Sequence, residues 1–296
     1  MQQIVECVPN FSEGRRPEVI DAIVATIAAV PGAHVLDRQS DASHNRTVVT
    51  FVGTPEVALE AAFQGCRHAA ELIDLTDHQG EHPRMGATDV IPFIPVRGVT
   101  MDDCVQLARR LGQRIGEELS IPVYLYEQAA TRPGRQNLAD VRKGEFEGIR
   151  EVIGVDPAHE PDFGPRAMGN AGATAVGARA FLIAFNVYLN TDNVEIAKKI
   201  AKTVRHSSGG LRYVKALGLL VNGQAQVSMN LTDFHQTPIH LVVEMIRREA
   251  SRYGVMISHT ELVGMAPQQA LLDVAAWYLQ LDSFNSDLVL ENRLMG

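Results

Sequence analysis

The sequence predicts an α+β protein, an α/β sandwich made of two β-α-β-β-α-β units. Short runs rich in β-branched and aromatic residues alternate with longer segments whose apolar residues recur at the spacing of one helix face. The order strand, helix, strand, strand, helix, strand occurs twice, in residues 4–96 and in residues 179–264. With 296 residues and 46% hydrophobic content, the chain can bury a large core.

In the first unit, two helices are expected to begin at prolines. Apolar residues recur at helical spacing after Pro17 and after Pro55, and Thr54 is a suitable cap before the second proline. A third helix is predicted over residues 101–119. Strands are predicted at residues 4–8, 33–37, 46–53, 89–96 and 121–127. The last helix and strand therefore extend the unit beyond six elements.

The second unit repeats the order without repeating the sequence. Asp192 and Glu195 have the spacing of a capping box, and Thr237-Pro238 should cap a second helix. Strands are predicted at residues 179–189, 214–221, 225–232 and 255–264. Each unit should thus be an antiparallel-rich sheet covered by helices on one face, and the bare face of each sheet is expected to pack on the other unit.

A polar tract rich in proline and glycine connects the two units at residues 130–178. Part of it should be helical around residues 138–153, and the rest is either a linker or a binding loop. Glycines at positions 164, 169, 172 and 177 favour the binding loop, because glycine lets backbone amides approach a ligand closely. We assign the tract to the first domain, giving boundaries of 1–178 and 179–296.

Composition excludes several classes of partner. The formal net charge of −8 argues against a nucleic-acid surface, so an anionic ligand would need a locally positive pocket. No run approaches the roughly 20 apolar residues that span a bilayer, and the start of the chain does not resemble a signal peptide, so we expect no membrane partner and a cytoplasmic location. The widely spaced cysteines, Cys7, Cys66 and Cys104, indicate buried or spare thiols.

The stretch "HQGEHPRMGATDVIPFIPV" (78–96) is the most informative in the chain. His78, Glu81 and His82 match the H-x-x-E-H pattern of some zinc peptidases. That chemistry needs a continuous helix, which Gly80 and Pro83 oppose, so no metal is expected. The glycine tract also fails the nucleotide motifs, because Ala and Arg follow it where a P-loop has Lys and Ser or Thr.

Without metal, this loop still carries the groups for acid-base chemistry. It combines histidines that can transfer protons, a cation at Arg84 that can bind a carboxylate, and Asp89 just before a strand. The alternative is a surface loop with a capping histidine.

Two further segments, 8–15 and 43–47, also lie at strand ends of the first unit. They contain Asn10, Ser12 and Arg15, and Asn45 and Arg46, and could equally be turns and caps. Together the three segments predict a small-molecule site without naming the reaction.

Several long motifs in order resemble the glutamate formimidoyltransferase family. They are "VECVPNFSEG", "NRTVVTFVG", "HQGEHPRMGATDVIPFIPVRG", "PVYLYE", "DFGP" followed by "GATAVGAR" and "FLIAFN", and "AQVSMNLTDF". The likeness covers nearly the whole chain and is that of a stand-alone transferase, related to the transferase half of the bifunctional formimidoyltransferase-cyclodeaminases.

The resemblance implies transfer of a formimino group from N-formimino-L-glutamate to tetrahydrofolate, giving 5-formiminotetrahydrofolate and L-glutamate in histidine degradation. It implies two ferredoxin-like subdomains with stacked sheets, helices on the outer faces and the folate in a tunnel between them. Tetrahydrofolate would be a cosubstrate, with no permanently bound metal or redox cofactor. A homodimer is expected.

The resemblance also carries residue roles. The family's catalytic histidine falls on His82. Its folate-contacting segment falls on Gly164, Pro165, Arg166, Ala167, Met168, Gly169, Asn170, Ala171, Gly172 and Ala173. Animal bifunctional enzymes have an aspartate where this chain has Gln39, so the carboxylate that assists His82 is expected nearby, at Asp41 or Asp37.

These residues suggest a mechanism. His82 would take the proton from N5 of the attacking tetrahydrofolate and return it to the departing glutamate nitrogen, while Asp41 orients it or stabilises the amidinium. Asn10 and Asn45 would contact substrate, and Arg46, Arg84 or Arg166 would bind the substrate carboxylates. Two alternatives stay open: a glutamate formyltransferase using N-formylglutamate and 5-formyltetrahydrofolate, and a non-catalytic folate-binding protein.

Overall fold

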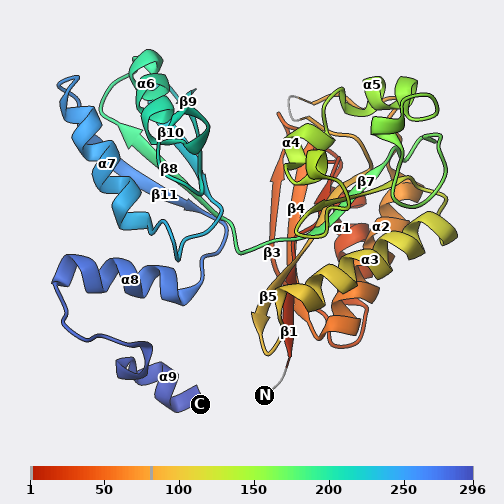
Figure 1. Ribbon diagram of the computed structural model, residues 1–296, viewed down its shortest axis with the longest axis horizontal. Helices are drawn as coiled ribbons and strands as arrows, with labels where there is room; N and C mark the ends of the chain where they lie inside the picture. Colours follow the sequence, from red (N-terminus) through yellow and green to blue (C-terminus); the bar gives the residue numbers. More distant parts are fainter. Residues whose placement is uncertain (1–2, 81–82, 296) are drawn as a thin grey trace. The chain divides into compact units, whose positions relative to one another are not determined.

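The structure of the chain is a computed structural model that describes residues 3–80 and 83–295. It is a mixed α+β protein with two compact units, Met1–Arg179 and Ala180–Gly296, each of which is described by itself (Figure 1). In the described part of the chain, no helix is long and apolar enough to cross a membrane.

The first unit is built on a mixed, 7-stranded sheet. Both β1 and β2 pair antiparallel with β4 on one side and β5 on the other; β3 extends the sheet beyond β4, and β7 and then β6 extend it in parallel beyond β5. The strands are β1 (Ile4–Cys7), β2 (Asn10–Phe11), β3 (His34–Asp41), β4 (Arg46–Gly53), β5 (Thr88–Arg97), β6 (Val123–Glu127) and β7 (Thr174–Ala178).

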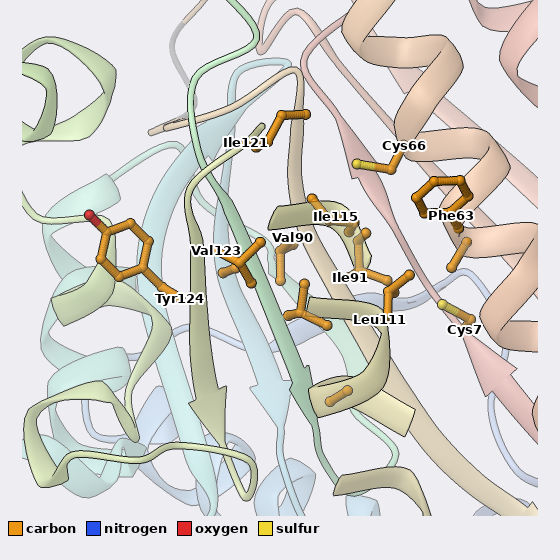
Figure 2. Packing of buried hydrophobic residues seen from close by; sticks show 14 of the residues in the cluster. Cys7, Phe63, Cys66, Val90, Ile91, Leu111, Ile115, Ile121, Val123 and Tyr124 are labelled. Carbon is orange, nitrogen blue, oxygen red and sulfur yellow. The ribbon is translucent and has the colours of Figure 1, made fainter. Parts of the chain in front are cut away.

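Three long helices pack on this sheet: α1 (Pro17–Ala28), α2 (Pro55–Leu72) and α3 (Met101–Glu118). Prolines occupy the first turn of α1 and α2, and α3 begins with a capping box in which Thr100 Oγ1 accepts from the Asp103 amide at 3.2 Å. Figure 2 shows Phe63 and Cys66 of α2 and Leu111 of α3 in this core beside Ile91 of β5.

The connector between β6 and β7 carries shorter helical segments. They are η1 (Pro133–Arg135), α4 (Leu138–Val141), α5 (Glu145–Val152) and η2 (Pro157–His159). The helical stretch expected around residues 138–153 is therefore confirmed as two short helices, broken where Gly144 adopts a φ of 94°.

The second unit is an antiparallel, 4-stranded sheet in the order β11-β8-β10-β9. Its core is formed with α6 and α7, while α8 packs on α7. The elements are β8 (Ile183–Leu189), α6 (Val194–Val204), η3 (His206–Ser208), β9 (Val214–Val221), β10 (Gln224–Leu231), α7 (Ile239–Ser251), β11 (Ile257–Val263), α8 (Gln268–Leu279), η4 (Ser286–Leu288) and α9 (Leu290–Met295).

Some local expectations were wrong. Part of the tract expected to form a loop is the buried strand β7, and residues 179–182 precede β8 instead of belonging to it. Asn193, not Asp192, caps α6, accepting from the Glu195 amide at 3.1 Å. Thr237 does not cap α7, because its hydroxyl donates to the carbonyl of Arg212 at 2.7 Å.

Candidate functional site

The three segments singled out in the sequence meet at one place in the first unit. The start of β4, the loop before β5 and the residue after β2 surround a small hollow, which we name the β4–β5 hollow. It is lined by Ser12, His44, Asn45, Arg46, His78, Arg84 and Asp89. His82 and Glu81 lie outside the described residues, but the residues that flank them in sequence, 80 and 83, are described.

Asn45 forms the turn into β4 and holds two neighbouring segments together. Its φ of 50° is a left-handed conformation that asparagine tolerates better than most residues. Its side-chain oxygen accepts from the Gly14 amide at 2.9 Å, and its amide nitrogen donates to the Gln79 carbonyl at 3.0 Å. A Cβ on Gly80 would lie 2.3 Å from the carbonyl oxygen of His44, so glycine is needed there. The β4 turn and the 78–80 segment are thus packed backbone to backbone.

Arg84 is buried, and all three nitrogens of its guanidinium group donate hydrogen bonds to other residues of the chain. Its Nε donates to Nδ1 of His78 at 3.2 Å, and its guanidinium nitrogens pair with Glu147 at 2.7 and 2.9 Å and with Glu145 at 3.1 Å. The carboxylates raise the pKa of Arg84, and Arg84 lowers the pKa of Glu147. A substrate carboxylate would therefore have to compete with these acids for Arg84.

Asp89, a lining residue of the hollow, interacts with two arginines. Its Oδ1 accepts from the Met85 amide at 2.9 Å, and its Oδ2 forms an ion pair with Arg142 of the connector. Burial raises the pKa of Asp89 and lowers that of Arg46, on which Arg142 also acts by repulsion. Two cations, Arg46 and Arg142, thus act on one buried carboxylate.

Asp41 ends β3 beside the hollow and lies next to His44; its predicted partner, His82, lies outside the described residues. Its Oδ1 accepts from the amides of Ser43 and His44 at 2.8 and 2.9 Å, and its Oδ2 lies 3.2 Å from Nδ1 of His44. The hydrogen bond from the His44 amide lowers its pKa. Gln39 is exposed and Asp37 half-buried on β3, and the Gln39 amide donates to Asp37 at 3.0 Å. Asp41 is therefore a carboxylate with a lowered pKa that contacts the hollow's lining through His44.

The glycine tract is pinned to the start of β5. The Ala87 amide donates to Ala171 and the Ala173 amide donates to Met85, at 2.8 and 2.9 Å. A Cβ on Gly86 would lie 1.9 Å from the Ala173 oxygen. The tract and the loop after His82 thus form one packed body.

Within the tract, the middle faces solvent. Residues 166, 167, 169 and 170 are exposed, whereas residues 168, 172 and 173 are buried. Arg166 pairs with Glu160, and Asn170 donates to Asp74 at 2.7 Å. Asn10 bends back to the Val8 carbonyl at 3.1 Å and is not among the residues that line the hollow.

Arg142, Glu145 and Glu147 of the connector were not predicted. Glu145 and Glu147 contact Arg84, which precedes them by 61 and 63 residues, and Arg142 pairs with Asp89 of β5. The cluster of charged residues in "DVRKGEFEGIRE", next to a helical pattern, was the only sequence feature that could have indicated their contact with the site. Residues 3–80 and 83–295 hold no group of three metal-ligating side chains.

Comparison with known proteins covers both units. Residues 4–179 match the family described as the formiminotransferase domain, N-terminal subdomain, and residues 184–293 match the formiminotransferase domain. The chain belongs to the formiminotransferase family.

Relatives of this family are similar over the full chain. A glutamate formimidoyltransferase of Streptococcus pyogenes serotype M1 is 51% identical over 100% of both chains. One of Thermoplasma acidophilum is 50% identical, covering 98% of this chain and 97% of that one. A formimidoyltransferase-cyclodeaminase of Sus scrofa is 49% identical over 96% of this chain but only 54% of the relative. The chain thus matches about half of the bifunctional relative and all of the first.

Proposed function

We propose that the chain is a glutamate formimidoyltransferase that moves the formimino group of N-formimino-L-glutamate to tetrahydrofolate, releasing L-glutamate, in histidine degradation. The observation that carries this proposal is the 51% identity to a protein of that name over the full length of both chains. The β4–β5 hollow supports it, because it gathers polar and cationic side chains beside the sequence position of His82.

His82 is proposed as the catalytic base and acid. Nucleophilic attack by N5 of tetrahydrofolate on the amidine carbon forms a tetrahedral intermediate, and N5 must then lose a proton. Collapse of that intermediate breaks the bond to the glutamate nitrogen, which must gain a proton. One imidazole can perform both transfers in turn. Asp41, whose pKa is lowered, would remain ionised and stabilise the cationic amidinium.

Substrate binding is proposed for residues around the hollow and for the glycine tract. Arg46 or Arg84, which line the hollow, or Arg166 of the glycine tract would bind the substrate carboxylates; at Arg84 the substrate would compete with Glu145 and Glu147, and at Arg166 with Glu160. Asn45, which lines the hollow, and Asn10 on β2 are proposed to contact substrate. The exposed middle of the tract within Gly164–Ala173 would contact the folate.

The same proposal covers the wider organisation. Residues 1–178 would form the N-terminal subdomain with the catalytic histidine and folate segment, and residues 179–296 the C-terminal one. Each is proposed to be ferredoxin-like, supported by the strand orders β5-β1-β4-β3 and β11-β8-β10-β9, the split β-α-β arrangement. We also propose a cytoplasmic homodimer with tetrahydrofolate as its cosubstrate.

Purified protein tests the reaction with two donors. It should form 5-formiminotetrahydrofolate from formiminoglutamate and tetrahydrofolate. Turnover only in the reaction of N-formylglutamate with tetrahydrofolate would instead assign a formyltransferase. Binding of tetrahydrofolate without turnover of either donor would leave a folate-binding protein and refute the enzymatic proposal.

A further inference from the structure

The geometry points to His78 as a positioning residue of the transferase site, which ties the chain on both sides of His82 to one rigid framework. This inference rests on the proposed function. It concerns a histidine that never needs to touch substrate, because its ring is already used on both edges by the protein.

The contacts of His78 fix its tautomer. Nε of Arg84 lies 3.2 Å from Nδ1 of His78, and because arginine only donates, Nδ1 must be the acceptor. The other nitrogen, Nε2, lies 3.0 Å from the carbonyl oxygen of Asn45, which only accepts, so Nε2 carries the proton. His78 is therefore a neutral imidazole with a single allowed tautomer.

These two contacts hold opposite flanks of His82. On the preceding side, His78 is joined to Asn45, whose side chain also holds the Gln79 carbonyl at 3.0 Å. On the following side, Arg84 contacts the ring and the carbonyl of His78, at 3.2 Å each, and is clamped by Glu147. The α5 segment adds a bond from the Phe146 amide to the Arg84 carbonyl at 2.9 Å. His78 is the group shared by both flanks.

Acid should undo this arrangement. A second proton on Nδ1 would face the N–H of Arg84, placing donor against donor and cation against cation. Burial lowers the pKa of His78, so the neutral form persists below the ordinary range of histidine. The charged and titratable groups that act on His78 or share its hollow are Arg84, Arg15, Glu13, Glu147, His44, Arg46 and Asp89.

The test compares three variants with the wild type. His78→Ala removes both contacts, and His78→Asn restores an acceptor near the position of Nδ1 for Arg84. The matched control is His206→Ala, an exposed histidine of the second unit. We expect kcat to fall about 10- to 100-fold in His78→Ala, since displacement of a reacting group by about 1 Å has this effect. The KM values should stay within about threefold, and His78→Asn should recover most of kcat.

Two readouts separate positioning from mere structural support. Nitrogen-15 NMR of histidine-labelled protein should show His78 protonated only on Nε2 at neutral pH. In the wild type, kcat should fall at acidic pH with the titration of His78 that NMR detects. In His78→Asn, this part of the pH dependence of kcat should be absent. A proton on Nδ1 or an unchanged kcat in His78→Ala would overturn the inference. So would a His78→Asn variant whose kcat stays as low as that of His78→Ala and whose kcat has the same pH dependence as that of the wild type. A wild type without transfer to tetrahydrofolate would refute the proposed function, and with it this role, whereas active wild type with unaffected variants would refute this role alone.

Discussion

Replacement of Asp89 by asparagine tests the buried ion pair at the hollow. Asp89 is 2% exposed, and the side chain of its partner Arg142 is 14% exposed. Asparagine keeps the shape and an acceptor for the Met85 amide, so the substitution removes mainly charge. Breaking a buried pair by removing one partner destabilises proteins by about 3–5 kcal/mol, because the other charge is left unmatched.

We expect a loss near the lower end of that range, about 3 kcal/mol, because water reaches part of Arg142. Arg46 should increase the loss of stability in Asp89→Asn, because Asp89 attracts the Arg46 guanidinium and Arg142 repels it. Arg142→Met should also destabilise the protein by leaving the Asp89 carboxylate poorly matched. The double variant removes both charges, so its loss should be well below the sum of the single losses.

Urea unfolding followed by circular dichroism gives the free energies of this double-mutant cycle. Trp277 is the chain's single tryptophan and lies in the second unit, so its fluorescence does not report on this pair. A coupling of about 2 kcal/mol or more is expected. Additive losses, or a loss below about 1 kcal/mol for Asp89→Asn, would contradict a stabilising interaction between Asp89 and Arg142.

Three further predictions follow from packing and burial. Gly86→Ala should destabilise the first unit by about 2 kcal/mol or more in urea unfolding, because its Cβ would meet a carbonyl oxygen of the glycine tract at 1.9 Å, whereas Gly169→Ala, with open space around it, should be tolerated. Burial raises the pKa of Glu6 to about 7 from 4.5, so between these values the folded chain holds a proton that the unfolded chain releases. The stability that Glu6 contributes is therefore complete below about pH 4.5 and falls by about 3 kcal/mol as the pH rises to about 7. This fall should disappear in Glu6→Gln when the free energy of unfolding is compared at acidic and alkaline pH. Burial also raises the pKa of Cys66 and Cys104 to about 11 and about 12, so these thiols should react with a disulfide reagent only after unfolding; rapid reaction in the native protein would contradict their burial.

The order of elements could be predicted because it depends on periodicity, which each segment carries by itself. Strand β7 could not, because its sequence "TAVGA" contains small residues typical of loops. The structure gives the reason for them: β7 is buried between β5 and β6, and a Cβ on Gly177 would lie 2.6 Å from the ring of Tyr126. The small side chains of β7 thus allow it to pack closely against β6, a strand that is distant in sequence.

The candidate site was predictable only in part for the same reason. Asn45, Arg46 and Arg84 could be found because they lie at strand ends, where loops of one sheet edge gather. Arg142 and Glu147 of the connector pair with Asp89 and Arg84. The local sequence of the connector does not indicate which segment its charged residues contact, so these partners could not be predicted.

The proton-transfer role of His82 is tested most directly by measuring formation of 5-formiminotetrahydrofolate with the wild type, with His82→Ala and with the control His206→Ala. We expect His82→Ala to lower turnover by about 100-fold or more, the contribution of a general acid-base group, while tetrahydrofolate still binds within a few-fold of the wild type. Turnover within about tenfold of the wild type would contradict this role, because His82 could not then carry both proton transfers.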